Sequence, residues 1–308
     1  MTPTPSGDPN RGRGFALLVN PASGGGAAPG AVLPVARLLR DAGARVEVSY
    51  SPGPGATRAL VGEAVARGDV VVSVGGDGML SSVAGEVSRA GGVLGVLPAG
   101  RGNDFARMLD LPRTPQAQAA LLLDGRARQV DLLACDERIV AGSVYAGVDA
   151  RAAQIVDGWR RLPGALHYPA AAVRAVAGYR PGRYRLVVDG VVREVSAATV
   201  VVANSGYYGQ GMRIAPAASV SDGLLDVVVV GAASRLSLLR GLPSLYDGRH
   251  VERDEVQVFA ASQVELSTVP GTPVPVGGDG EPFGTLPDDG DRPLRVRVLP
   301  GALTLLAG

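Results

Sequence analysis

Three glycines and one aspartate follow an apolar stretch at residues 70–74, in the order Gly75-Gly76-Asp77-Gly78. Glycines adopt backbone angles closed to other residues and let a phosphorylated ligand approach the main chain. A helix that starts here would present its N-terminal N–H groups to an anion. The Asp77 carboxylate could hold a metal ion, accept a proton or order water around a magnesium–nucleotide. The same residues would also make an ordinary strand-to-helix turn.

Two further glycine-rich segments each follow an apolar stretch. In residues 20–26, Asn-Pro-Ala-Ser-Gly-Gly-Gly, the backbone N–H groups and the Ser23 hydroxyl could bind phosphate, although a flexible loop would have the same composition. In residues 98–107, Asn103 or Asp104 suits the N-cap of a following helix. Capping explains one of these two polar side chains, but it explains neither the pair nor the nearby Arg101.

A fourth segment, residues 277–281, holds two carboxylates in the run Gly-Gly-Asp-Gly-Glu. Asp279 and Glu281 stand two residues apart in this glycine setting. Such a pair could supply a general base and a group that orders a metal ion. A hairpin turn with exposed acidic side chains is the plainer interpretation.

Composition limits the classes of protein to which the chain can belong. Its 308 residues, 46% hydrophobic and 19% charged, suit a globular protein of two domains. The net charge of +1 gives no general reason to expect a nucleic acid partner. The sequence contains no lysine, which excludes the Walker-A lysine, the protein-kinase strand lysine and Schiff-base chemistry. An ATP site in this chain therefore needs another architecture.

The first part of the chain alternates strand and helix patterns. Apolar strands are expected at residues 15–19, 46–50, 70–74 and 93–97, with amphipathic helices between them. Such alternation is typical of a parallel sheet covered by helices. Ligands of these sheets bind beyond the carboxyl ends of the strands, where each glycine-rich loop of this region falls.

The pattern changes after about residue 128. Residues 184–195 predict a hairpin around Asp189-Gly190, and further short strands are expected downstream, at 199–203, 225–230, 257–259, 264–267 and 294–299. Residues 155–183 differ, because they mix aromatic side chains with five arginines in a partly helical pattern. This segment is either a helix packed on the sheet with solvated arginines or a surface that contacts anionic lipid. We expect a disordered N-terminus at 1–13, an α/β domain at 14–128 and an all-β domain at 129–308, whose last few residues could return to the first domain.

The order and spacing of these motifs resemble the diacylglycerol kinase catalytic domain. The residues that carry the resemblance are the loop 75–78, the segment 98–107, the pair of segments 215–217 and 222–226, and the late run 279–281. The chain is most similar to the soluble bacterial lipid kinases of the YegS type, and the resemblance extends from Phe15 to Leu299.

The resemblance implies an N-terminal α/β domain with a parallel sheet like that of NAD kinases and phosphofructokinases. It also implies a C-terminal β-sandwich with a helical insertion that holds the lipid, and an active site between the two domains. The expected cofactors are ATP and Mg²⁺. The expected partner is a lipid substrate at a membrane surface. No nucleic acid partner is expected, and a homodimer stays open. A cytoplasmic protein that works at the inner membrane face is the expected setting.

The resemblance also assigns roles to individual residues. Catalytic roles fall to Asp77, Asp279 and Glu281, with the last two deprotonating the lipid hydroxyl. A structural Mg²⁺ would be held by Asp222 and by main-chain oxygens of Ser219 and Leu224, and Asp149 matches another polar family position. The nucleotide would be bound by Asn20, Ser23, Gly24, Gly25, Gly26, Ser51, Gly75, Gly76, Asp77, Gly78, Gly100, Arg101, Asn103 and Asp104.

Two residues depart from the family pattern. Met79 and Arg101 stand where the family usually has hydroxyl side chains that could bind phosphate. Arg101 could make a stronger phosphate contact, whereas Met79 could only pack.

Two other functions therefore stay open. One is an NAD kinase-like enzyme, which would share the Gly-Gly-Asp-Gly loop. The other is a nucleotide or lipid sensor without turnover.

Overall fold

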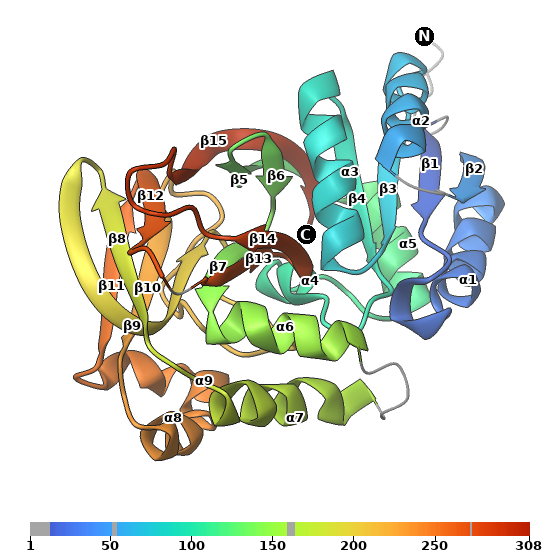
Figure 1. Cartoon of the computed structure of the whole chain (residues 1–308). Helices are drawn as coiled ribbons and strands as arrows, with labels where there is room; N and C mark the ends of the chain where they lie inside the picture. Colours follow the sequence, from blue (N-terminus) through green and yellow to red (C-terminus); the bar gives the residue numbers. More distant parts are fainter. Residues whose placement is uncertain (1–12, 51–53, 159–163, 272) are drawn as a thin grey trace, which may run out of the picture. The chain divides into compact units, whose positions relative to one another are not determined.

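The computed structural model describes residues 13–50, 54–158, 164–271 and 273–308 (Figure 1). The chain divides into two compact units. The first comprises Met1–Gly100, Leu109–Gln129 and Leu303–Gly308, and the second comprises Arg101–Met108 and Val130–Ala302. The sequence placed the boundary at 128/129 and did not anticipate that Arg101–Met108 groups with the second unit. Ser51 and residues 1–12 of the predicted N-terminal segment lie outside the described residues.

The first unit contains a parallel sheet in the order β2-β1-β3-β4, to which the end of β15 adds. Strands β1 and β3 are buried along their whole length, as expected for parallel strands covered on both faces. Helix α1 turns a buried stripe, from Ala28 through Val32 to Leu39, toward this sheet. The bounds are β1 Gly14–Val19, β2 Arg45–Tyr50, β3 Val70–Gly75, β4 Val93–Pro98, α1 Ala28–Asp41, α2 Pro54–Ala66, α3 Asp77–Ala90 and α5 Pro115–Asp124.

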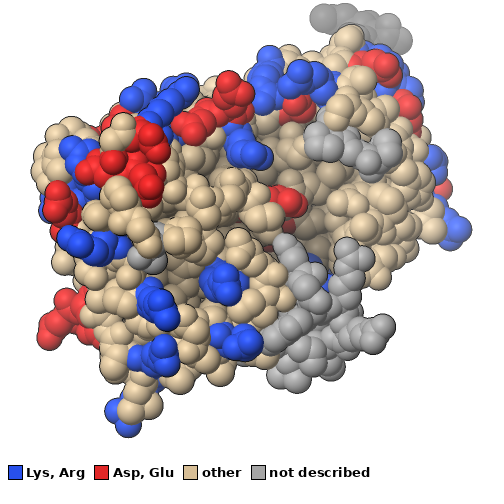
Figure 2. All heavy atoms as spheres, viewed as in Figure 1, with Lys and Arg blue, Asp and Glu red and all other residues tan. Residues whose placement is uncertain are grey.

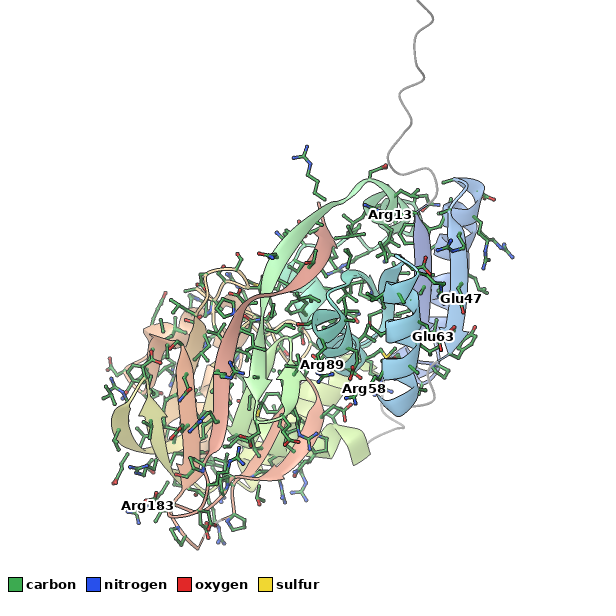
Figure 3. All side chains as sticks on the ribbon, turned by 90° about the horizontal axis from the view of Figure 1, so that it is seen from above. Arg13, Glu47, Arg58, Glu63, Arg89 and Arg183 are labelled. Carbon is green, nitrogen blue, oxygen red and sulfur yellow. The ribbon has the colours of Figure 1, made fainter. Side chains whose placement is uncertain are left out.

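Two helices of the first unit are joined by an ion-pair cluster. Helix α2 packs against α3, and Arg58 of α2 and Arg89 of α3 both pair with Glu86 (Figure 3). Partial burial opposes ionisation of Glu86, but the hydrogen bonds from Arg89 and Arg58 outweigh it and lower the pKa of this carboxyl. The cluster holds the helix whose first turn carries Asp77.

The second unit is a β-sandwich-like domain built from antiparallel pairs. A helical pair, α6 and α7, packs together, and α7 also contacts α8 (Figure 1). The apolar core includes Tyr184, Leu186, Val200 and Val264. The bounds are α4 Asp104–Met108, β5 Arg126–Cys135, β6 Arg138–Val140, β7 Ser143–Gly147, α6 Val148–Gly158, α7 Gly164–Ala177, β8 Gly182–Val188, β9 Val191–Ala203, β10 Leu225–Gly231, α8 Arg235–Gly241, α9 Ser244–Asp247, β11 Val256–Ala261, β12 Gln263–Thr268, β13 Pro275–Gly278, β14 Glu281–Thr285 and β15 Leu294–Ala307.

The predicted fold class is confirmed in both units: a parallel α/β sheet in the first, and a β-sandwich with a helical insertion in the second. The predicted hairpin is β8–β9, whose turn residues Asp189 and Gly190 both have positive φ, at 45° and 85°. Two consecutive residues with positive φ are the requirement of a type I′ turn, and Asp-Gly meets it well.

Candidate active site

Three loops of the first unit meet at the carboxyl ends of β1, β3 and β4. The Asn20 N–H donates to the Val74 carbonyl at 3.2 Å, which ties the first loop to the end of β3. The Ala99 N–H donates to the Gly75 carbonyl at 2.8 Å, which ties the third loop to the second. The glycines allow this approach, because a Cβ on Gly24 would lie only 2.4 Å from the Ala99 carbonyl oxygen. The structure thus brings together three segments that the sequence assigned to the nucleotide.

The second loop leads directly into helix α3. Gly76 is the N-cap in an extended conformation and makes no side-chain cap, and Asp77 occupies the first turn. The Ser23 hydroxyl lies near this loop, 3.1 Å from where a Gly75 Cβ would be. A helix N-terminus capped by glycine and bordered by a serine hydroxyl is suited to an anion, since its N–H groups point outward along the helix axis. These residues fit the phosphates of a nucleotide without any lysine.

Met79 packs on the same loop. A Cβ on Gly75 would lie 2.9 Å from the Met79 Cβ, so this side chain takes up the space beside the glycine. Met79 therefore supplies apolar contact where the family usually supplies a hydroxyl, as the sequence indicated.

We expect Gly24→Ala to lower the free energy of unfolding by about 2–4 kcal/mol, because it combines a left-handed backbone (φ 63°) with a backbone clash. Gly26→Ala is the matched control: its φ is also positive, at 95°, but no atom lies within 4 Å of the added Cβ. Its cost should stay near 1 kcal/mol. Urea unfolding of both variants measures the difference, and equal losses would show that the close approach to Ala99 does not matter.

Asp104, the first residue of α4, is buried in the second unit. Its carboxylate accepts hydrogen bonds from the backbone N–H groups of Gln210 at 2.9 Å and Gly211 at 2.7 Å. Burial raises the pKa of Asp104, an effect that these two amides and Arg107 oppose and the charge of Asp279 reinforces. Asp104 thus anchors the turn at Gln210–Gly211. A contact of Asp104, Asn103 or Arg101 with a nucleotide stays a prediction.

Asp279 lies in the turn between β13 and β14. Asp279 and Gly280 both have positive φ, at 46° and 87°, so the plainer interpretation of a hairpin turn holds for the backbone. The carboxylate is also anchored, because it accepts three backbone N–H bonds of 2.9–3.0 Å, from Ala141, Gly142 and Ser143. Asp189 makes the same arrangement in the β8–β9 turn, with Ser262 and Gln263 as donors.

Glu281 begins β14, directly after this turn, and is exposed. The Gly280 N–H donates to the Tyr145 hydroxyl at 2.9 Å, which fixes the turn residue before it. The hairpin therefore presents one anchored carboxylate and one exposed carboxylate, two residues apart, on a fixed backbone.

The predicted metal segment, residues 219–224, is organised by a residue that the sequence did not single out. Asp131 is buried, and its carboxylate accepts the N–H of Gly223 at 2.8 Å and of Gly301 at 2.7 Å. Asp222 itself is exposed and accepts the Leu224 N–H at 3.0 Å. Partial burial of the neighbouring Asp226 raises the pKa of that carboxyl, and the negative charge of Asp222 adds to the rise.

Among the described residues there is no group of three or more His, Cys, Asp or Glu side chains that could hold a metal ion. The predicted ligand set differs from such a cluster, because it needs one carboxylate and main-chain oxygens. Carboxylate and main-chain oxygens are the donors that Mg²⁺ prefers. The exposed Asp222 carboxylate can supply one of these oxygens, and the Mg²⁺ site formed with main-chain oxygens of Ser219 and Leu224 stays a prediction.

If Asp222 holds a structural Mg²⁺, millimolar Mg²⁺ without nucleotide should raise the melting temperature by about 5 °C, the effect of about 2 kcal/mol of ligand stabilisation. Asp222→Asn should abolish this response. Asp124→Asn, which removes an exposed carboxylate at the end of α5, should preserve it. Thermal melts with and without EDTA make the measurement, and a response retained in Asp222→Asn would contradict the assignment.

Comparison with known proteins gives matches along nearly the whole chain. Residues 14–135 match the diacylglycerol kinase catalytic domain, and residues 142–307 match the YegS C-terminal NAD kinase beta sandwich-like domain. The chain is 36% identical over 270 residues to a diacylglycerol kinase of Mycobacterium tuberculosis, covering 85% of this chain and 87% of that protein. The chain belongs to the diacylglycerol kinase family.

Two further matches also extend over most of the chain. A Pseudomonas aeruginosa protein described as a probable lipid kinase YegS-like is 31% identical, with 86% of this chain and 85% of that protein covered. The crystal structure of a diacylglycerol kinase from Bacillus anthracis superposes with a TM-score of 0.67 at 18% identity, covering 96% of this chain and 97% of that one. At that identity the likeness shows the fold alone.

No helix in the described parts of the chain is long and apolar enough to cross a membrane.

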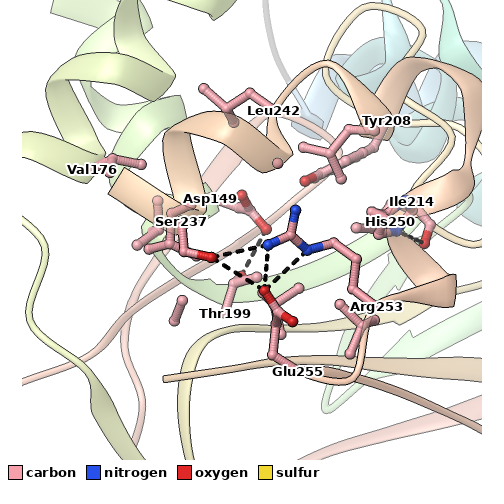
Figure 4. Close-up of a pocket in the computed structure, with 17 residues that line it drawn as sticks. Asp149, Val176, Thr199, Tyr208, Ile214, Ser237, Leu242, His250, Arg253 and Glu255 are labelled. Atoms are coloured by element: carbon pink, nitrogen blue, oxygen red, sulfur yellow. Dashed lines mark hydrogen bonds and ion pairs between the residues drawn. The ribbon is translucent and has the colours of Figure 1, made fainter. Parts of the chain in front are cut away.

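A cavity of about 70 Å³ in the second unit lies beside Asp149, the further polar position that the family resemblance marked (Figure 4). The Asp149 carboxylate accepts a hydrogen bond from the Thr199 hydroxyl at 2.7 Å. Burial raises the pKa of Asp149, and hydrogen bonds from Thr199 and Tyr208 partly oppose this rise. Aliphatic side chains form much of the wall, among them Val176, Leu242 and Leu245. No sequence motif marked Thr199 and Tyr208, because they come from separate elements.

Proposed function

We propose that this chain is an ATP-dependent lipid kinase that transfers the γ-phosphoryl group of ATP to a hydroxyl of a lipid such as diacylglycerol. One observation carries the proposal: a chain with two domains of the diacylglycerol kinase family keeps both the Asp77 loop and the Asp279–Glu281 hairpin. The absence of lysine agrees with a phosphate site made of backbone N–H groups.

Bound ATP supplies the phosphoryl group, and Mg²⁺ neutralises part of its charge. Within the first unit, the N–H groups around Gly24 and at the start of α3 would contact the phosphates, together with the Ser23 hydroxyl. Asp77 would order the Mg²⁺ and its water ligands, because its carboxylate lies in the same first turn. Fixed dipoles of this kind need no reorientation as charge develops.

The hairpin of the second unit offers the base. A carboxylate has about four acceptor positions, and backbone amides take three of those on Asp279. Glu281 is exposed, so its oxygens are open to a substrate hydroxyl. We therefore assign proton removal from the lipid hydroxyl to Glu281 and the positioning of the turn to Asp279. An alcohol is a poor nucleophile at neutral pH, so a positioned carboxylate assists its attack.

Diacylglycerol is the acceptor in the name of the Mycobacterium tuberculosis relative, and the aliphatic cavity wall beside Asp149 suits an apolar chain. Labelled ATP with Mg²⁺ and a panel of acceptors tests the proposal. Label is expected in the organic extract when diacylglycerol is present. Label in NADP would favour an NAD kinase-like enzyme, and tight nucleotide binding without any product would favour a sensor, for which Met79 is the supporting residue.

A further inference from the structure

Two segments of the second unit contain no acidic residue at all. Residues 158–188 carry no Asp or Glu, and neither do residues 227–246. The whole chain has 29 acidic residues in 308, about one in eleven, so these 51 residues would ordinarily hold four or five. Both segments contain arginines, and the structure brings them together, because α7 of the first contacts α8 of the second.

The exposed sides of α7 and α8 combine apolar and cationic side chains. On α7, Ala171, Ala175 and Val176 are buried, whereas Val173 is 50% exposed and Arg174 is exposed. On α8 no residue is buried, and Leu236 is 56% exposed. We call Val173, Arg174, Arg180, Arg235, Leu236 and Arg240 the α7–α8 surface. Figure 2 shows arginines among uncharged residues on this part of the face it displays.

Helix α8 is fixed with this side outward. Ser234 caps its N-terminus by accepting the Ser237 N–H at 3.1 Å. The Ser237 side chain faces the cavity of Figure 4, where it accepts a hydrogen bond from Arg253 at 2.9 Å. Leu236 and Arg240 stand four residues apart and therefore share a helix face. A capped helix that keeps a leucine and an arginine on its outer face has the pattern of an interfacial helix.

The arginines of this surface are available to a partner. The ion pairs found among the described residues include none from Arg174, Arg180, Arg235 or Arg240. Arg235 does donate to the Tyr179 carbonyl, at a long 3.4 Å. Single exposed leucines are common in soluble proteins, but an exposed leucine and an exposed valine on helices that also carry arginines without an ion pair are complementary to an anionic, partly apolar partner.

We propose that the α7–α8 surface docks this protein on an anionic lipid bilayer. The arginines contact lipid phosphates, and Leu236 and Val173 enter the boundary between headgroups and acyl chains. This inference rests on the proposed function, because a lipid kinase must meet a substrate that stays in the membrane. For residues 155–183, of which 159–163 lie outside the described residues, it favours lipid contact by the described part, and it adds α8, which the sequence did not mark.

Sedimentation with vesicles tests the docking without ATP or turnover. The full chain should bind vesicles that contain phosphatidylglycerol, bind pure phosphatidylcholine vesicles far more weakly, and dissociate as salt is raised. The double variant Arg174→Gln/Arg240→Gln should lose about 25-fold in affinity, about fivefold for each arginine. Leu236→Asn should also weaken binding, since it removes an apolar side chain from the interface.

The control variant Arg126→Gln/Arg128→Gln removes two exposed arginines of β5, with the same change in net charge. Its affinity should stay within twofold of the parent chain, and thermal melts should show all variants folded. Equal losses in both double variants, or equal binding to neutral vesicles, would overturn the proposal. A concentration-dependent dimer that only the α7–α8 variants dissociate, without vesicle binding, would overturn it in favour of a second copy.

A water-soluble short-chain diacylglycerol separates this proposal from the proposed function. Docking variants should phosphorylate the dispersed substrate at the parent rate and lose activity only on vesicles. Vesicle binding through this surface by a chain that phosphorylates no lipid would leave the docking intact and refute the kinase. Phosphorylation of vesicle lipid at the parent rate by the Arg174→Gln/Arg240→Gln variant would refute the docking alone.

Discussion

Glu281→Gln is expected to lower the rate of phosphoryl transfer by about 10²–10⁴-fold, the usual contribution of a general base. Glutamine keeps the size of the side chain but cannot accept the proton of the lipid hydroxyl. Glu281 is exposed and makes no part of the apolar core, so the variant should fold normally. Nucleotide affinity, measured by calorimetry, should stay within about twofold, because the nucleotide contacts proposed above come from other residues.

Glu137→Gln is the matched control for this variant. Glu137 is an exposed glutamate that also follows an aspartate of positive φ, Asp136, in the turn between β5 and β6. Its replacement should leave both rate and affinity unchanged. A Glu281→Gln protein that turns over at the parent rate would show that Glu281 is not the base, and Asp279→Asn would then test Asp279 in that role.

Asp279→Asn is expected to lower the free energy of unfolding by about 2–5 kcal/mol, because hydrogen bonds to a charged group contribute about 1.5–3 kcal/mol each. The asparagine keeps one acceptor oxygen and places an NH₂ group against the N–H donors of Ala141 and Gly142. The turn should shift, carry Glu281 with it and lower turnover even where the protein remains folded. Urea unfolding and initial rates together make the measurement.

Asp189→Asn separates stability from catalysis in this prediction. Asp189 occupies the corresponding place in another Asp-Gly turn and accepts backbone N–H bonds from Ser262 and Gln263. Its variant should also lose stability, but each folded molecule should turn over at the parent rate. If both variants lose turnover to the same degree, the effect of Asp279 is one of folding, and its positioning role is wrong.

Regular elements of this chain could be predicted because their signals are local. Residues 70–74 are valines except for Ser73, and Asp189-Gly190 is a two-residue turn signal between two strands. Strand β5 was not predicted, because its first four residues are exposed and its last six are buried, which gives no period of two. Strands β13 and β14 are short and glycine-rich, so they carry little strand propensity.

The arrangement of the candidate site could be predicted where it consists of consecutive residues and not where it depends on distant partners. The loops at residues 20–26, 75–78 and 98–100 have visible glycine patterns, and the sheet places them together. Asp131 looks like one acid in an apolar strand, and its partners Gly223 and Gly301 lie 92 and 170 residues further on. The grouping of Arg101–Met108 with the second unit depends likewise on the contact of Asp104 with Gln210–Gly211, which no local pattern encodes.

The proposed activity is the phosphorylation of a lipid hydroxyl with ATP as the phosphoryl donor. The most direct measurement incubates the full chain with ATP, Mg²⁺ and dioleoylglycerol in mixed micelles, and quantifies phosphatidate and ADP by mass spectrometry. We expect phosphatidate and ADP in equal amounts, both dependent on Mg²⁺ and both lost in Glu281→Gln. ADP without phosphatidate across a panel of lipid alcohols, or no ADP at all, would contradict the proposed activity.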